Sequence, residues 1–274
     1  MMVEALVYFF VPALVGVLIG IASGLLGIGG GTVMVPIFRL AFGMSATMST
    51  ATSLFAIIPT SISGAISHVK GKTCIPALGI AAGLGGACLS PVGVWLAQLS
   101  PDWLVMLAAA IIIGYSAINM FKKAFKLRPA GQPAAGVDAA APTADNSSLS
   151  RKQLLQGAAI GLVAGLASGY VGVGGGFIMV PLMLSIIGIP MRKASGTSLI
   201  AVMILAIPGV IEQGIIGNIN YLAGIAIVIG TIPGAVIGAR LVTKVPERTL
   251  RLLFGCFLIV AAVMLVLNEV GIFG

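Results

Sequence analysis

Two glycine-rich segments are the parts of this sequence best suited to bind a ligand. Each has the pattern Ser-Gly-x-x-Gly-x-Gly-Gly-Gly, and the second follows the first at an offset of 145 residues. Glycine in a helix costs about 1 kcal/mol relative to alanine, so each copy is expected to interrupt a helix. The freed amides, with a helix that begins after them, form a pocket suited to an anion. The candidate binding residues are Gly27, Gly29, Gly30, Gly31, Gly172, Gly174, Gly175 and Gly176.

Hydroxyl side chains near both motifs supply further hydrogen-bond donors. A Thr-Ser-Leu triplet follows each motif at the same offset, and each motif opens on a serine, Ser23 or Ser168. Close helix packing is the alternative interpretation of the glycines, because small residues permit tight crossings without binding anything. The hydroxyl residues added to the candidate site are Thr32, Thr52, Ser53, Thr197 and Ser198.

Other reactive residues are sparse. His68 is the single histidine, and Gln213 occupies the equivalent position 145 residues later, after the second motif. We consider His68, Gln213 and Arg39 for gating or coupling, against an interfacial histidine and an arginine that snorkels to a headgroup. No metal-ligand cluster or nucleophile–base pair occurs in the sequence, so we expect no metal, no cofactor and no enzymatic activity. No Lys-Ser or Lys-Thr follows the glycines, which excludes a nucleotide-binding loop.

Membrane helices must position these residues. The chain is 59% apolar and only 8% charged, with a mean hydropathy of +1.16, whereas about 25% of residues in a soluble domain are charged. Apolar runs long enough to span a bilayer recur along nearly the whole chain. We predict an all-α polytopic membrane protein with eight to ten spans. Its expected partners are the lipid bilayer and a small anionic substrate, not nucleic acid, and the sequence leaves monomer and homodimer open.

The chain is organised as two related halves. Ten of the 21 positions in 23–43 are identical to those in 168–188, without a gap. We predict a first repeat in residues 1–121, a disordered cytoplasmic linker in 122–152, which is charged and then rich in Ala, Pro, Asp and Ser, and a second repeat in 153–274. The expected apolar segments are 5–22, 31–43, 49–67, 74–98 and 103–121, then 152–170, 176–188, 194–213, 218–240 and 249–268.

Charge placement predicts the orientation. With the linker inside and every segment crossing, 14 of the 15 Lys and Arg residues lie on the cytoplasmic side, as the positive-inside rule requires. Both termini then lie outside, and five crossings per half make the second repeat inverted, a plan found in secondary transporters with broken helices. The second segment of each half is short for a hydrocarbon core of ~30 Å. It is either a broken or tilted span, or one arm of a re-entrant hairpin.

The two motifs resemble those of the sulfite exporter TauE/SafE family of bacterial membrane proteins. The resemblance rests on Gly24–Pro36, on the second copy Gly169–Pro181, and on the two Thr-Ser pairs. It implies a multi-pass protein of the bacterial plasma (inner) membrane that carries a sulfur-containing anion, such as sulfite or an organosulfonate like sulfoacetate. We therefore expect a secondary exporter that works by alternating access, with one repeat rocking against the other around a central site. A channel-like facilitator, or an importer of other small organic or inorganic anions, is the alternative.

Overall fold

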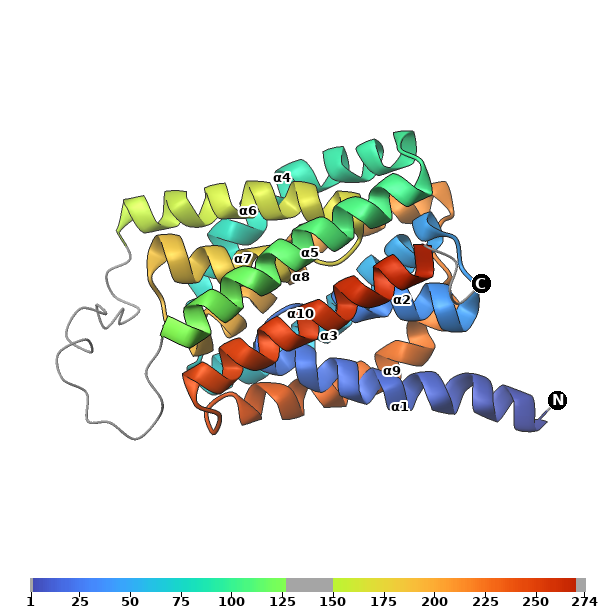
Figure 1. Ribbon diagram of the computed structural model, residues 1–274, viewed down its shortest axis with the longest axis horizontal. Coiled ribbons are helices and arrows are strands. Elements are labelled where there is room, and N and C mark those ends of the chain that lie inside the picture. The colour runs from blue at the N-terminus through green and yellow to red at the C-terminus, as the bar shows by residue number, and fades with distance from the viewer. Residues whose placement is uncertain (1, 127–149, 270–274) are drawn as a thin grey trace.

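The protein is a bundle of helices that run roughly along one long axis (Figure 1). The computed structural model describes residues 2–126 and 150–269, and this part of the chain contains helices and no strand. The first half contributes α1 (Met2–Leu26), α2 (Gly31–Phe42), α3 (Ala46–Lys70), α4 (Pro76–Leu99) and α5 (Asp102–Lys126). The second half contributes α6 (Arg151–Val171), α7 (Gly176–Leu182) with the π-helical turn η1 (Met183–Ile187), α8 (Met191–Ile216), α9 (Tyr221–Leu241) and α10 (Glu247–Glu269). The predicted all-α fold is confirmed.

The helices have the lengths and surfaces of a multi-pass membrane protein. Within the described residues, seven are long and apolar enough to span a bilayer: α3, α4, α5, α6, α8, α9 and α10. Large apolar side chains such as Leu155, Phe125 and Ile215 are exposed on the outside, where a soluble protein would place charge. The shorter apolar helices include Gly31–Phe42 and Gly176–Ile187, the two short second segments expected from the sequence.

Helices pair across the two halves rather than within them. α1 packs along α9, and the equivalent helix α6 packs along α4. A Cβ atom added to Gly230 of α9 would lie 1.8 Å from the carbonyl oxygen of Ala13, and one on Gly161 of α6 would lie 1.9 Å from that of Ala82. Such distances mean that the two backbones touch, which small residues allow. The halves are therefore interlocked, and each close pair contains one helix from either half.

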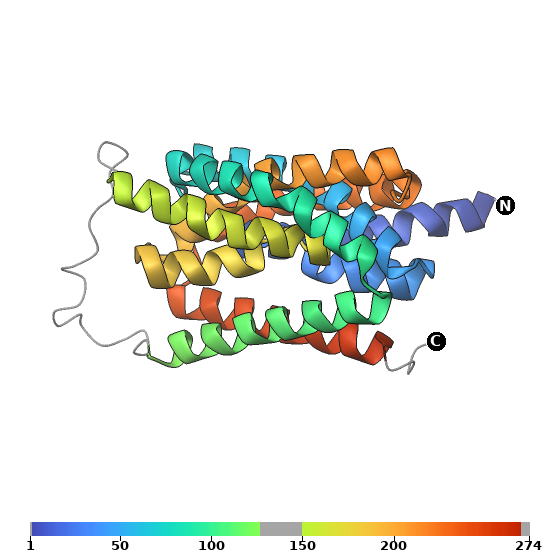
Figure 2. The same cartoon turned by 90° about the horizontal axis from the view of Figure 1, so that it is seen from above.

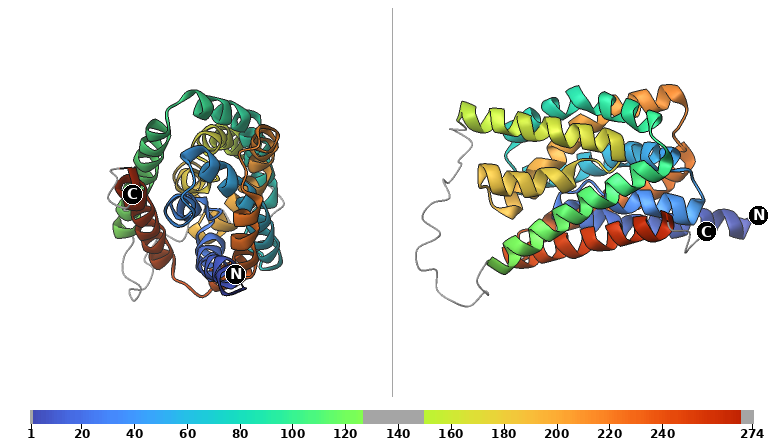
Figure 3. Two further views of the ribbon diagram at one scale, coloured as in Figure 1. Left: turned by 90° about the vertical axis from the view of Figure 1, so that its right-hand side faces the viewer. Right: turned by 45° about the horizontal axis from the view of Figure 1, so that its top comes forward.

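Equivalent helices run antiparallel in the ribbon. Figure 1 shows α1 and α6 running in opposite directions along the long axis, and α5 and α10 likewise. One end of the bundle holds the end of α5 and the start of α6, and the other holds the start of α1 and the end of α10 (Figures 1 and 3). This arrangement supports the inversion of the second repeat, which stays a prediction.

Acidic residues of α5 and α10, the fifth helix of each half, accept hydrogen bonds from the start of the third helix, α3 or α8. α5 and α10 lie side by side as a layer on one flank (Figure 2). The carboxylate of Asp102 accepts a hydrogen bond from the Ala46 amide at 3.2 Å, and that of Glu247 accepts one from the Met191 amide at 3.3 Å. Both contacts recur at the offset of 145 residues. A carboxylate at a helix N-terminus is stabilising, so the same device positions α3 and α8.

The linker begins later than the sequence predicts. α5 continues to Lys126, and Phe121 stacks on Phe125 with ring centroids 6.4 Å apart. Contacts four residues apart on a helix support its last turns, which explains why residues 122–126 are helical. α6 begins at Arg151. Most of the predicted linker, 127–149, lies outside the described residues, so its disorder stays a prediction.

Candidate functional site

The two glycine motifs form turns that interrupt the helical chain inside the bundle, between α1 and α2 and between α6 and α7. An L-residue with a side chain adopts left-handed backbone at a cost of about 1–2 kcal/mol, so the chain needs glycine there. Gly30 and Gly175 are the N-cap residues of the helices that follow. The glycines with positive φ in the two turns are Gly27, Gly29, Gly30, Gly172, Gly174 and Gly175.

The two turns touch each other. A Cβ on Gly31, the first residue of α2, would lie 2.5 Å from the carbonyl oxygen of Val173. A Cβ on Gly176, the first residue of α7, would lie 2.5 Å from the carbonyl oxygen of Gly27. Close packing, the alternative interpretation of the glycines, therefore accounts for Gly31 and Gly176. The same contacts bring the N-termini of two helices to one place in the fold.

Apolar side chains fill the space beside the crossing. Ile57 of α3 and Val202 of α8 occupy equivalent positions at the offset of 145 residues. Both would contact a Cβ at Gly29, at 3.3 Å and 2.9 Å, and both would contact one at Gly174, at 2.8 Å and 3.5 Å. Both side chains are fully buried. The polar groups available to a ligand therefore lie around this apolar centre rather than in it.

Buried hydroxyls without a hydrogen-bond partner occur around the first turn. The Ser61 hydroxyl lies 3.5 Å from the Cβ position of Gly29, and Cβ of Ser23 lies 3.7 Å from that of Gly30. Buried polar groups are normally hydrogen-bonded, so these hydroxyls are available to a polar ligand. Within the described residues, the fully buried and unpartnered hydroxyls on α1, α2 and α3 include Ser23, Thr32, Ser53 and Ser61.

The second turn is poorer in free donors. Ser168 is buried and unpartnered, and its Cβ lies 3.4 Å from the Cβ position of Gly175. Ser198, in contrast, donates a hydrogen bond to the carbonyl oxygen of Gly27 at 2.7 Å. The positions equivalent to Thr32 and Ser61 carry Phe177 and Ala206, which have no hydroxyl. The sequence comparison of the halves missed Ser61 for this reason, although Ser53, Ile57 and Ser61 share one face of a helix by their spacing of four.

Two of the three predicted threonines, Thr52 and Thr197, join the halves. The Oγ1 of Thr197 accepts a hydrogen bond from the Ile75 amide at 2.9 Å, and that of Thr52 accepts one from the Asn220 amide at 3.0 Å. Ile75 and Asn220 are the N-cap residues of α4 and α9. Each threonine therefore holds the start of a helix from the opposite half, and the serines beside the turns are the better candidates for donors to a ligand.

His68 and Gln213 are structural contacts at equivalent positions. His68 is fully buried, its Nε2–H donates to the carbonyl oxygen of Gly24 at 2.8 Å, and its Nδ1 contacts the hydroxyl of Thr73 at 2.7 Å. The side-chain oxygen of Gln213 accepts a hydrogen bond from Asn218 at 2.8 Å. His68 ties the end of α3 to the last turn of α1, just before the first break. Its position at the membrane interface and its gating role stay predictions.

Arg39 lies apart from the turns. It is half-buried in the last turn of α2, eight residues after Gly31, or about 12 Å along the axis at 1.5 Å per residue. A cation at this end complements the helix dipole. Among the described residues, no group of three or more His, Cys, Asp or Glu side chains is placed to hold a metal. The hydrogen-bonding groups identified beside the turns are hydroxyls and backbone amides, which are neutral.

Comparison with known proteins decides the family. The family model described as sulfite exporter TauE/SafE matches residues 12–265. The chain belongs to this family. It is 27% identical to the probable membrane transporter protein YunE of Bacillus subtilis (strain 168), over 97% of this chain and 99% of the relative. It is 28% identical to YdhB of the same organism, over 87% and 92%, and 28% identical to a probable membrane transporter protein of Haemophilus influenzae, over 93% and 97%.

These matches establish the coarse function. The TauE/SafE chain is a multi-pass membrane transporter, as its apolar helices also indicate. The names of its relatives describe transporters, which fits the expectation that it is not an enzyme. No solved structure matches the chain.

Proposed function

We propose that this protein exports a small sulfur-containing anion, such as sulfite or an organosulfonate like sulfoacetate, through a site beside the two glycine turns. The observation that carries the proposal is the set of buried, unpartnered hydroxyls around the first turn, among them Ser23 and Ser61. The description of the family supplies the sulfur anion and the direction of transport.

The chemistry of the site suits an oxyanion that must bind and then leave. Part of the first turn of each helix is already hydrogen-bonded, because the amides of Val33 and Ile178 donate to the N-cap glycines Gly30 and Gly175, and that of Gly176 donates to Gly174. The remaining amides, such as those of Gly31 and Thr32, lie at a helix N-terminus, which favours negative charge. Serine hydroxyls add donors for the several oxygens of a sulfite or sulfonate group. Neutral donors hold an anion less tightly than a buried ammonium would, because charge-assisted hydrogen bonds are the stronger ones. Release on the far side is then not hindered by an ion pair.

Alternating access in this fold uses units that combine the two halves. The backbones of α1 and α9 touch, as do those of α4 and α6, so one repeat cannot rock against the other as an intact body. The pairs α1–α9 and α4–α6 move instead, around α3, α8 and the turns. A membrane potential that is negative inside favours anion exit by about 2.3 kcal/mol per charge per 100 mV. Export as a uniport therefore needs no coupled ion.

Flux into proteoliposomes tests the proposal. We expect sulfite, thiosulfate or sulfoacetate to be carried with saturable kinetics, faster than sulfate and faster than carboxylates of matched size. Ser61→Ala and Ser53→Ala are each expected to lower the flux about tenfold, because each variant loses one hydrogen bond that a buried hydroxyl donates to the anion. Ser63→Ala is the matched control on the same helix, because its hydroxyl donates to the Ile232 carbonyl oxygen instead.

Three results would overturn parts of this proposal. Unchanged flux in both Ser61→Ala and Ser53→Ala would place the site elsewhere. Equal flux of sulfur anions and matched carboxylates would refute the substrate class. Flux that does not saturate would favour the channel-like alternative over a carrier.

A further inference from the structure

A lateral cavity lies between α4, α5, α6 and the α7–η1 segment, and no motif glycine lines it. Its volume is about 790 Å³, within the usual range of small-molecule sites. Tyr115 and Val163 line it and are 68% and 56% exposed. The cavity therefore opens sideways onto the apolar flank of the bundle, which faces acyl chains in a membrane. Its apolar walls include Leu96, Ala108, Ile112, Leu166 and Leu182.

One wall of the cavity carries a row of polar side chains. Ser116, Asn119 and Lys123 of α5 all line it, and their spacing of three and four residues puts them on one helix face. The Lys123 ammonium donates a hydrogen bond to the carbonyl oxygen of Pro181 at 3.0 Å, and the Ser185 hydroxyl donates to the same oxygen at 2.6 Å. A cation therefore marks the end of the cavity close to the last turn of α5.

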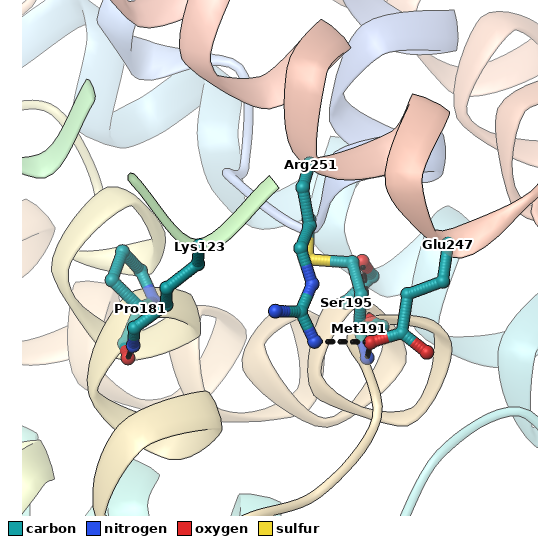
Figure 4. Close-up of polar contacts among 6 residues, drawn as sticks. All are labelled: Lys123, Pro181, Met191, Ser195, Glu247 and Arg251. Atoms are coloured by element: carbon teal, nitrogen blue, oxygen red, sulfur yellow. Dashed lines mark hydrogen bonds and ion pairs between the residues drawn. The ribbon is translucent and has the colours of Figure 1, made fainter. Parts of the chain in front are cut away.

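Among the described residues, the acidic side chains do not neutralise the positive charge at this end of the cavity. Arg251 of α10 lies between Lys123 and Glu247 in Figure 4 and forms an ion pair with Glu247. In the described part of the chain, the structure gives Lys123 no carboxylate partner. One carboxylate thus faces two cations. Unpaired charge at membrane depth is costly, so this site favours an anionic ligand.

Packing of the fold does not require polar side chains around this cavity. At the offset of 145 residues, the equivalents of Ser116, Asn119 and Ser185 are the apolar residues Ala261, Met264 and Leu40. The equivalent of Lys123 is Asn268, which is polar but uncharged. The other half also continues α2 as a regular helix where η1 forms a π-helical turn, a feature frequent at functional sites. The polar groups of Ser116 and Asn119 and the charge of Lys123 are therefore particular to this cavity.

We propose that the cavity binds an anionic phospholipid from the leaflet on the linker side, with its phosphate on Lys123 and an acyl chain along α5 and α6. Basic pockets between spanning helices on the cytoplasmic side are suited to such headgroups. Arg151 and Lys152 lie near the start of α6, beside the same end of the cavity, and add positive charge there. The lipid contacts Leu182 in the helix that follows the second glycine turn, so its binding affects the segment that the transport cycle uses.

Thermal unfolding of the purified full-length protein in detergent tests the lipid site. Phosphatidylglycerol is expected to raise the unfolding midpoint, and phosphatidylcholine with the same acyl chains is not. Lys123→Gln is expected to weaken phosphatidylglycerol binding about fivefold, the effect of one basic residue at an anionic surface. Lys122→Gln removes the same charge from the adjacent, exposed position and is expected to keep the affinity within about twofold.

A second variant tests the acyl-chain part of the site independently. Ala108→Phe fills the cavity from α5 and is expected to abolish the stabilisation by phosphatidylglycerol. Glycerol phosphate without acyl chains is expected to leave the midpoint unchanged. Equal binding of the two lipids, full phosphatidylglycerol affinity in Lys123→Gln, or a shift produced by glycerol phosphate alone would each overturn the proposal. None of these readouts depends on transport, so they are separate from the test of the proposed function.

Discussion

Gly30 and Gly175 differ in the room that each has for a side chain. Both have positive φ, 85° and 69°, so alanine at either position costs about 1–2 kcal/mol in backbone strain. A Cβ at Gly30 would meet side-chain methyl groups of Ile19 and Met34 at 3.0 Å and 3.1 Å, whereas one at Gly175 would meet the backbone carbonyl oxygen of Ala164 at 2.9 Å. We expect Gly175→Ala to lower the unfolding midpoint more than Gly30→Ala.

Gly43 provides the reference for this comparison. Its φ is 61° and a Cβ there would meet nothing within 4 Å, so Gly43→Ala reports backbone strain alone. The expected order of destabilisation is Gly175→Ala, then Gly30→Ala, then Gly43→Ala. A Gly175→Ala protein as stable as Gly43→Ala would contradict the close packing at the second turn.

Ser198 and Ser53 are equivalent residues in different environments. Replacing each by alanine therefore distinguishes an effect on stability from an effect on transport. The Ser198 hydroxyl donates to the Gly27 carbonyl oxygen, so Ser198→Ala leaves that buried acceptor unsatisfied at a cost of about 1–3 kcal/mol. The Ser53 hydroxyl has no partner within the described residues, so Ser53→Ala is expected to keep the midpoint and lose flux. Unfolding and proteoliposome flux measured on both variants check this. Equal losses of stability would show that Ser53 is a structural residue.

At the scale of the helices, the glycine crossings between halves are the contacts least able to accept a side chain. A Cβ on Gly161 would lie 1.9 Å from the Ala82 carbonyl oxygen, and α6 would have to move away from α4. Overpacking of this kind costs about 1–3 kcal/mol or more. We therefore expect Gly161→Ala to lower the unfolding midpoint strongly.

Gly114 of α5 is the matched control for this change, because a Cβ there would meet nothing within 4 Å. Alanine favours helix over glycine, so Gly114→Ala is expected to stabilise the protein by about 0.4–1 kcal/mol. Comparable midpoints for Gly161→Ala and Gly114→Ala would refute direct contact between the α4 and α6 backbones.

The sequence predicts the helices and the breaks better than it predicts their partners. The repeated glycines place both turns, because positive φ and loss of helix are local properties of Gly29, Gly30 and their equivalents. The partner of Thr52 is the amide of Asn220, 168 residues away, and nothing in a Thr-Ser-Leu triplet identifies that amide. Ser61 was missed because its equivalent is Ala206, so a search for repeated residues cannot find an asymmetric donor.

For the whole molecule, interlocking and pseudo-symmetry together restrict the transport cycle. Each of the close pairs α1–α9 and α4–α6 contains one helix from each half. A movement that opens one end of the site therefore changes contacts of both halves. The capping contacts of Asp102 and Glu247 tie the α5–α10 layer to α3 and α8. The lipid-facing layer is therefore mechanically connected to the helices that carry Ile57 and Val202 beside the turns. A lipid bound against α5 acts on the cycle through this connection.

The orientation of the bundle gives a prediction for the whole protein. α4 ends at the end of the bundle where α1 begins, and the α9–α10 loop lies at the end where α5 stops (Figure 1). With the positive end inside, a membrane-impermeant maleimide should label Gln98→Cys in intact cells and label Thr243→Cys only after permeabilisation. The exposed Cys88 and Cys256 are first replaced by serine.

Cys74 can stay in place for this labelling experiment. Burial raises the pKa of its thiol, and because the thiolate is the reactive form, it reacts slowly at neutral pH. The reverse labelling pattern would put the basic end outside and refute the predicted orientation. Labelling of both positions in intact cells would mean that the two ends do not lie on opposite sides of the membrane. The expected pattern supports a cytoplasmic linker and outer termini.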